Sequence, residues 1–81
     1  MRLDELPINA PATIIAIGWD SMDEGAARRL RAFGFDEGMS VETLHRGGFV
    51  ARDPLACRIG RMTVAIRRAH ATLIEVEVEA A

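Results

Sequence analysis

Apolar and polar residues alternate along five short stretches of the chain, which is the pattern of strands with one buried face. The clearest stretch covers residues 73–79, where Ile74, Val76 and Val78 are expected to point inward and the intervening glutamates outward. The other stretches cover residues 12–19, 41–46, 55–59 and 62–67. Only the tight turn Gly60-Arg61 separates the last two, so they are predicted to pair as a hairpin.

Residues 21–33 follow a different period, in which apolar side chains recur every three to four positions. Ala26, Leu30 and Phe33 then share one stripe, while the arginines of this segment face water. The sequence therefore predicts one helix of about three turns.

The two ends of this helix carry their own signals. Ser21 and Glu24 fit a capping box at its start. Gly34 is placed to end it in a left-handed conformation, and Gly38 is expected to take a positive φ in the turn over residues 35–38.

Five short strands and one helix in 81 residues predict a single, mainly β domain over residues 1–81. One buried face per strand indicates a small, strongly bent barrel, because a flat sheet would expose two edges and closure removes them. Leu3 and Leu6 are expected to enter the core from an N-terminal turn. Residues 49–54 are predicted to form a loop, and residues 68–71 a connection of about one helical turn.

Charge is distributed unevenly, although the net charge is only −2. Residues 1–45 hold four arginines and eight acidic residues, residues 46–70 six arginines and one acid, and residues 71–81 three glutamates. All ten basic residues are arginines, which we interpret first as a composition bias. Arginine is also common at protein interfaces, so the basic middle segment is a candidate contact surface.

The chain has no feature that would direct it into or across a membrane. No apolar run approaches the roughly 20 residues that a span requires. The N-terminus is acidic where a signal peptide would be basic, and no hydrophobic stretch follows it. Cys57 is the only cysteine and cannot form an internal disulfide, so a cytosolic protein is expected.

Groups that could carry out catalysis are scarce. A nucleophilic pair would need Cys57 with His45 or His70, but Cys57 lies on the apolar face of its strand, where a thiol is inert. A metal site could use the same three side chains and Asp53, yet none of their spacings is one that a helix face or short loop imposes. We therefore expect no enzymatic activity, no catalytic residue, no metal site and no cofactor.

Nucleic-acid binding is the first alternative that the charge pattern leaves open. The arginines of the basic segment could line one side of a barrel, as in small barrels that bind single strands. They are Arg46, Arg52, Arg58, Arg61, Arg67 and Arg68. Phe49 is the only aromatic residue of this segment and the whole chain is acidic, so contact with an acidic protein is favoured over nucleic acid.

Four motifs together carry a family resemblance. Residues 30–41 read Leu-Arg-Ala-Phe-Gly-Phe-Asp-Glu-Gly-Met-Ser-Val, and Asp53-Pro54, Ala-Ile-Arg-Arg at 65–68 and Leu-Ile-Glu-Val at 73–76 follow. Their order resembles the FeoA family, whose members show R-L-x-x-L-G-x-x-P-G-x-x-V, then G-D-P, then L-R-x-x-x-A-x-x-I-x-V. Glu37 replaces the family's proline and Arg52 the glycine before Asp53, and these differences affect the partner-binding loops.

The resemblance implies a small SH3-like barrel of five strands with the helix inserted after the first strand. It also implies a cytoplasmic accessory protein of bacterial ferrous iron uptake that contacts FeoB, a membrane transporter with a cytoplasmic G domain. That partner could recruit it to the inner face of the membrane. Because the same barrel forms the C-terminal domain of DtxR-type iron-dependent repressors, a metal-sensing or metal-carrying domain is the second alternative. No helix-turn-helix precedes the barrel here, which disfavours a free-standing regulator.

The contact with such a transporter is expected to use the helix, the turn after it and the basic loop region. The expected contact residues are Arg28, Arg31, Asp36, Glu37, Arg46, Phe49 and Arg52. Trp19 and Met22, beside the helix start, either add an exposed apolar anchor or pack in the core. Arg67 matches the family's arginine and is expected to hold a nearby carboxylate or carbonyl group.

Overall fold

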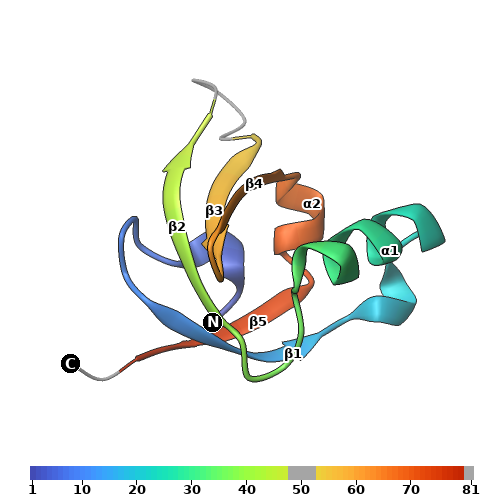
Figure 1. Cartoon of the computed structure of the whole chain (residues 1–81), viewed down its shortest axis with the longest axis horizontal. Coiled ribbons are helices and arrows are strands. Elements are labelled where there is room, and N and C mark those ends of the chain that lie inside the picture. Colours follow the sequence, from blue (N-terminus) through green and yellow to red (C-terminus); the bar gives the residue numbers. More distant parts are fainter. Residues whose placement is uncertain (48–52, 80–81) are drawn as a thin grey trace.

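A computed structural model describes residues 1–47 and 53–79 and contains one antiparallel sheet (Figure 1). Its strands are β1 (Ala12–Ile17), β2 (Ser40–Arg46), β3 (Leu55–Ile59), β4 (Met62–Ile66) and β5 (Ile74–Val78). The helices are α1 (Glu24–Phe33) and the four-residue α2 (Arg68–Ala71), and the 3₁₀ turns are η1 (Leu3–Glu5) and η2 (Trp19–Ser21). The mainly β class and the helix inserted after the first strand are confirmed.

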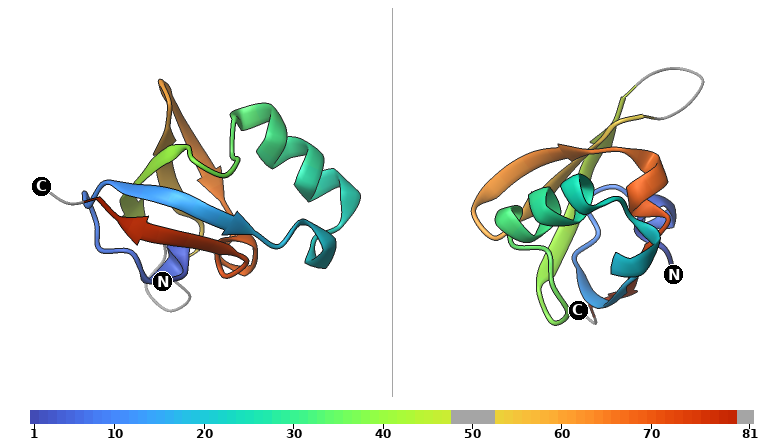
Figure 2. Two further views of the ribbon diagram at one scale, coloured as in Figure 1. Left: turned by 90° about the horizontal axis from the view of Figure 1, so that it is seen from below. Right: turned by 90° about the vertical axis from the view of Figure 1, so that its right-hand side faces the viewer.

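The sheet is strongly bent, and the β1–β5 pair is turned against the strands β2, β3 and β4 (Figure 2). Its strand order is β4-β3-β2-β1-β5. Register irregularities in β1 and β2 accompany the bend, as bulges do in other sheets. The predicted full closure needs correction, because β4 and β5 are the edges of the described sheet. Between them the chain forms α2, whose Ala71 is completely buried.

Alternate strand residues build the core, together with the N-terminal turn and the inner side of α1. The largest fully buried side chains are Phe35, Leu3, Leu6, Ile14, Leu55, Ile59, Ile74, Val41 and Val76. The inward positions predicted for Leu3 and Leu6 are confirmed, and so is the β3–β4 hairpin. The inward prediction for Val78 is wrong: this side chain is 46% exposed, because it pairs with Ala12 at the rim, where β5 ends.

The start of α1 differs from the predicted capping box. Ser21 belongs to η2, and the residue that caps the helix is Asp23. Its Oδ2 accepts a hydrogen bond from the N–H of Ala26 at 3.1 Å. A capping box from Ser21 would need Glu24 to be the third residue of the helix, but Glu24 is its first residue.

The rest of the helix follows the prediction. Ala26 and Leu30 are buried and Phe33 packs against the core. Gly34 ends the helix with a φ of 97°, in the left-handed region, and Gly38 follows with a φ of 88°.

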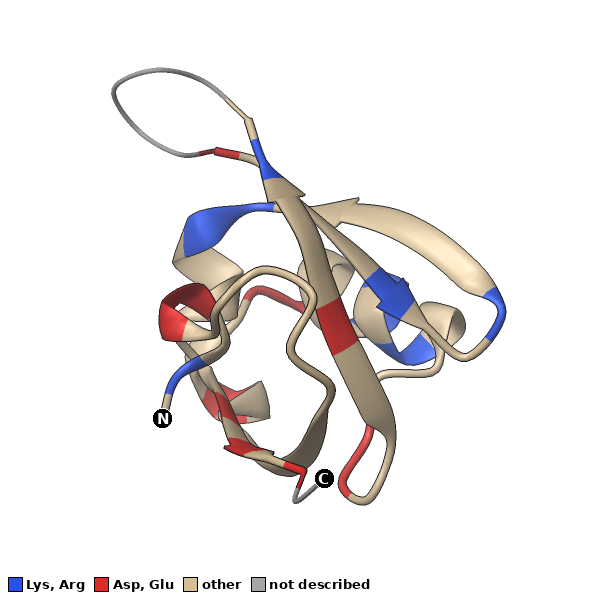
Figure 3. Ribbon diagram, turned by 90° about the vertical axis from the view of Figure 1, so that its left-hand side faces the viewer, with Lys and Arg blue, Asp and Glu red and all other residues tan. Residues whose placement is uncertain are grey.

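The uneven charge along the chain becomes a difference between the two edges of the sheet. Figure 3 shows basic segments in blue on the β3–β4 hairpin and acidic segments in red along the strand that leads to the C-terminus. The hairpin carries Arg58 and Arg61, and the opposite edge carries Glu75, Glu77 and Glu79. The side of the sheet that carries the β3–β4 hairpin is therefore more basic than the side that carries β5.

Candidate protein interaction surface

Trp19 lies at the point where the chain leaves β1 and turns toward α1. The N–H of Gly18 donates a hydrogen bond to the carbonyl oxygen of Leu73 at 2.8 Å, and the 3₁₀ turn η2 follows directly. Trp19 and Met22 are half-buried and pack against the core from outside. Both interpretations of these residues thus hold in part, since each packs on the core and still presents an apolar edge to solvent.

Arg31 of α1 covers the indole ring of Trp19. Its Cζ lies 4.3 Å from the ring centroid, the geometry of a cation–π contact. At an exposed site such a contact contributes about 0.5–1 kcal/mol. None of the described carboxylates forms an ion pair with this guanidinium.

Two hollows, both open to solvent, adjoin this stacked pair. One of about 510 Å³ also contacts Asp20, Met22, Glu24, Ala27 and Arg28. The other, of about 590 Å³, also contacts Gly34, Phe35, Asp36 and Met39. We call the surface formed by Trp19, Met22, Arg28, Arg31, Asp36 and Met39 the Trp19 face. Its two hollows are lined by two arginines and three carboxylates, a mixture that suits a protein surface better than a polyphosphate chain.

The Trp19 face unites part of the predicted contact set. Arg28, Arg31 and Asp36 lie on it. Glu37 is exposed in the adjoining turn, where its N–H donates to Oδ1 of Asp36 at 2.8 Å. The other two predicted contact residues, Phe49 and Arg52, lie outside the described part of the chain.

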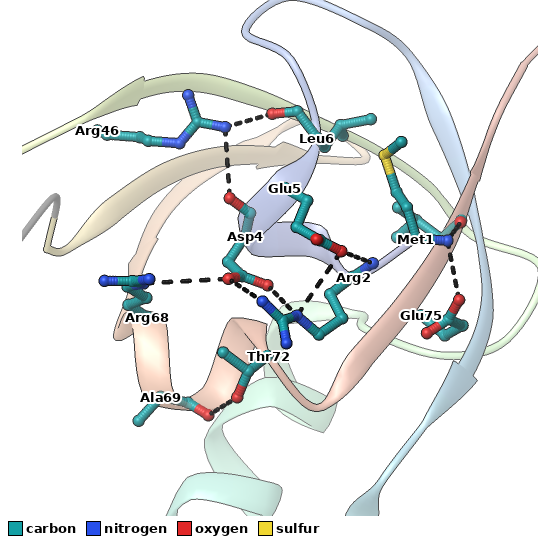
Figure 4. A network of polar contacts seen from close by, with 11 residues as sticks. Met1, Arg2, Asp4, Glu5, Leu6, Arg46, Arg68, Ala69, Thr72 and Glu75 are labelled. Atoms are coloured by element: carbon teal, nitrogen blue, oxygen red, sulfur yellow. Dashed lines mark hydrogen bonds and ion pairs between the residues drawn. The ribbon is translucent and has the colours of Figure 1, made fainter.

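Arg46 is half-buried and lies away from the Trp19 face, so its predicted part in the contact stays a prediction. Its Nη2 donates hydrogen bonds to the carbonyl oxygens of Leu6 and Asp4, so it joins β2 to the N-terminal turn (Figure 4). The carboxylate of Asp4, 4% exposed, pairs with Arg2 at 3.0 Å and lies 3.9 Å from Arg68. This network stabilises the N-terminal turn.

Arg67 was predicted to hold a nearby carboxylate or carbonyl group, but Arg46 and Arg68 of this network do so instead. Arg67 itself is exposed, and among the described residues its side chain forms no hydrogen bond or ion pair. Its neighbour Arg68 instead uses its N–H to bind Oδ1 of Asp53 at 2.9 Å.

Cys57 is fully buried on β3 opposite Thr43 on β2, as its position in the strand predicts. Burial raises the pKa of its thiol from 9.0 to about 11, against smaller lowering effects of Thr43 and Arg46. The reactive thiolate is therefore scarce near neutral pH, and catalysis through Cys57 has no support. Within residues 1–47 and 53–79, no three side chains of His, Cys, Asp or Glu come together as metal ligands would.

None of the helices in the described ranges could span a bilayer. The longest, α1, has ten residues. At 1.5 Å per residue it is about 15 Å long, half of the roughly 30 Å of a hydrocarbon core.

Comparison with known proteins gives one family. A family model described as the FeoA domain matches residues 1–78. The solution NMR structure of the FeoA protein from Chlorobium tepidum is 25% identical, with a TM-score of 0.83 over 99% of this chain and 71% of that one. The crystal structure of Stenotrophomonas maltophilia FeoA complexed with zinc, described as an SH3 domain protein, is 31% identical, with a TM-score of 0.78 over 95% of this chain and 89% of that one. No curated protein sequence matches.

The predicted SH3-like barrel is thereby confirmed, and it also occurs in a regulator. A manganese-dependent transcriptional repressor is 20% identical, with a TM-score of 0.79 over 99% of this chain and 41% of that one. At this identity the similarity shows the fold alone, so the activity of the repressor is not transferred to this chain.

Proposed function

The chain belongs to the FeoA family, and on this basis we propose that it is an accessory protein of bacterial ferrous iron uptake that binds the transporter FeoB through the Trp19 face. It works in the cytoplasm by contact with the G domain of the transporter and catalyses no reaction itself. The observation that carries this proposal is the stack of Arg31 on a half-buried Trp19, within a family of iron transport proteins.

The stacked pair has the properties of an interface hot spot. Tryptophan and arginine are enriched among the residues that dominate binding energies. Because core packing holds Trp19 and the cation–π contact restrains Arg31, less rotamer entropy is lost on binding than for two free side chains. Arg28 and Asp36 lie beside the pair and add charges of both signs, which favours a specific orientation of the partner.

The size of the chain also fits a contact of ordinary extent. A standard interface buries about 800 Å² on each partner, and the accessible surface here is 5063 Å². The Trp19 face and its margins would therefore use about one sixth of the surface, which leaves room for a second binding surface.

Recovery of the transporter from a detergent extract tests the proposal. Immobilised wild-type chain is expected to retain FeoB of the same organism from solubilised membranes. The double variant Arg28→Glu/Arg31→Glu should reduce the recovery at least tenfold, which corresponds to about 1.4 kcal/mol.

The matched control is Arg29→Glu/Arg67→Glu, which makes the same change in net charge at residues outside the Trp19 face. This control should retain FeoB as the wild type does, with circular dichroism showing that both variants are folded. Equal recovery by the two double variants, or loss by the control alone, would contradict the proposed surface.

A further inference from the structure

A second groove lies between α1, β4 and α2 and shares no lining residue with the two hollows of the Trp19 face. Its apolar lining comes from Ala26, Leu30 and Phe33 of α1, from Ala65 and Ile66 of β4, and from Pro54. Its volume is about 190 Å³. Pockets for metabolites typically need about 300 Å³ or more, whereas a cavity of about 150 Å³ accommodates a benzene ring. The groove therefore has room for one apolar side chain and not for a metabolite.

The rim of this groove is basic. Arg29 of α1, Arg67 at the end of β4 and His70 of α2 line it, and no described carboxylate does. Neither arginine forms an ion pair with a described residue. Asp23 approaches from the margin, with its Oδ1 4.0 Å from Nε2 of His70. An apolar side chain flanked by carboxylates matches such a site, because each carboxylate could form an ion pair with one of the two arginines.

The backbone of β4 beside the groove is also available. Ile59 and Met62 flank the two-residue turn of the β3–β4 hairpin and therefore form a hydrogen-bonded pair. Hydrogen-bonded and non-hydrogen-bonded pairs alternate along an antiparallel ladder, so Thr63 and Ala65 belong to non-hydrogen-bonded pairs. The N–H and C=O groups of Thr63 and Ala65 consequently point away from β3. Both residues are exposed, and no described strand pairs with this edge. A free edge of this kind is a template for an added strand.

We propose that the β4 edge binds an extended acidic segment of a partner protein, which pairs with Thr63 and Ala65 and inserts one apolar side chain between α1 and Ile66. Carboxylates on either side of that anchor contact Arg29 and Arg67. This binding is independent of the transporter contact, since different residues form the two surfaces and each can be lost alone.

Fluorescence anisotropy with the purified chain tests the proposal. The probe is a labelled peptide of alternating glutamate and aliphatic residues with a central leucine. Saturable binding is expected, and the variants Arg29→Glu and Arg67→Glu should each weaken it about tenfold. The matched control Arg28→Glu, one position away on α1, should change it less than about twofold because Arg28 lies on the Trp19 face. A probe with lysine in place of glutamate should not bind.

Amide hydrogen exchange provides a readout of strand addition itself. On saturation with the acidic probe, the amides of Thr63 and Ala65 should be protected while those of the Trp19 face stay unchanged. Four results would overturn the proposal: no saturation at about 1 mM peptide, equal effects of Arg28→Glu and Arg29→Glu, unprotected edge amides, or tighter binding of a single-stranded oligonucleotide. A concentration-dependent dimer that Arg29→Glu abolishes would also overturn it, by assigning the groove to a second copy of the chain.

Discussion

Arg46 offers the sharpest separation between a structural role and a role in partner binding. Its guanidinium binds the carbonyl oxygens of Leu6 and Asp4, and the side chain of Leu6 is completely buried. The substitution Arg46→Met preserves most of the aliphatic stem but removes both hydrogen bonds. We expect it to destabilise the protein without weakening transporter binding by the folded fraction.

The magnitude follows from the two hydrogen bonds. Bonds from a charged donor contribute about 1.5–3 kcal/mol each, but the bond to Asp4 is long at 3.4 Å and counts for little. Nε of Arg46 is buried without a described partner, so removing it recovers part of the loss. The expected decrease in unfolding free energy is therefore about 2 kcal/mol, which lowers the melting temperature by about 8–16 °C for a domain of this size.

Urea denaturation followed by circular dichroism measures this loss, with Arg58→Met as the matched control. Arg58 lies on the neighbouring strand, is exposed and pairs with Glu42 only at 3.7 Å, so its substitution should cost at most about 1 kcal/mol. If Arg46→Met costs no more than Arg58→Met, the assignment of Arg46 to the N-terminal network is wrong.

Two further predictions concern the helix start and the core. Asp23→Ala should lower the unfolding free energy by about 1 kcal/mol in the same urea titration, because it removes the helix cap. Ser21→Ala should change it by less than about 0.5 kcal/mol. A larger loss for Ser21→Ala than for Asp23→Ala would show that Ser21 caps the helix after all. Folding raises the pKa of the Cys57 thiol from 9.0 to about 11, so its stabilising effect is complete below pH 9 and disappears as the pH rises to 11. This difference corresponds to about 2–3 kcal/mol, and a wild-type stability profile between pH 9 and 11 that matches the profile of Cys57→Ala would contradict it.

Elements set by local patterns could be predicted from the sequence, and elements set by distant contacts could not. Alternation placed the β3–β4 hairpin correctly because strand burial repeats every two residues. Ser21 and Asp23 are both good helix caps two positions apart. The choice between them depends on η2, which follows the hydrogen bond from Gly18 to the distant Leu73.

The same distinction explains the errors at single side chains. The turn over residues 35–38 was predicted without a place for the side chain of Phe35, which the fold buries in the core. The structural hydrogen bonds expected of Arg67 are made by Arg46 instead. Only the folded chain brings Arg46 to the carbonyl group of Leu6, 40 residues earlier.

Part of the candidate site was also accessible from the sequence. Helical spacing places Arg28 and Arg31 on one side of α1, and the turn carries Asp36 next to them. The stack of Arg31 on Trp19 depends on how η2 packs beside α1, and no periodicity contains that information. Met39 was missed because a lone methionine after a turn has no pattern around it.

The indole N–H signal of Trp19 reports on whether the Trp19 face meets the G domain of FeoB. The chain contains one tryptophan, so a nitrogen-15 correlation spectrum shows a single indole signal. Titration with the G domain should shift or broaden this signal together with the amides of Arg28, Arg31 and Asp36. An indole signal that stays in place while amides elsewhere shift would show that the G domain binds a different surface.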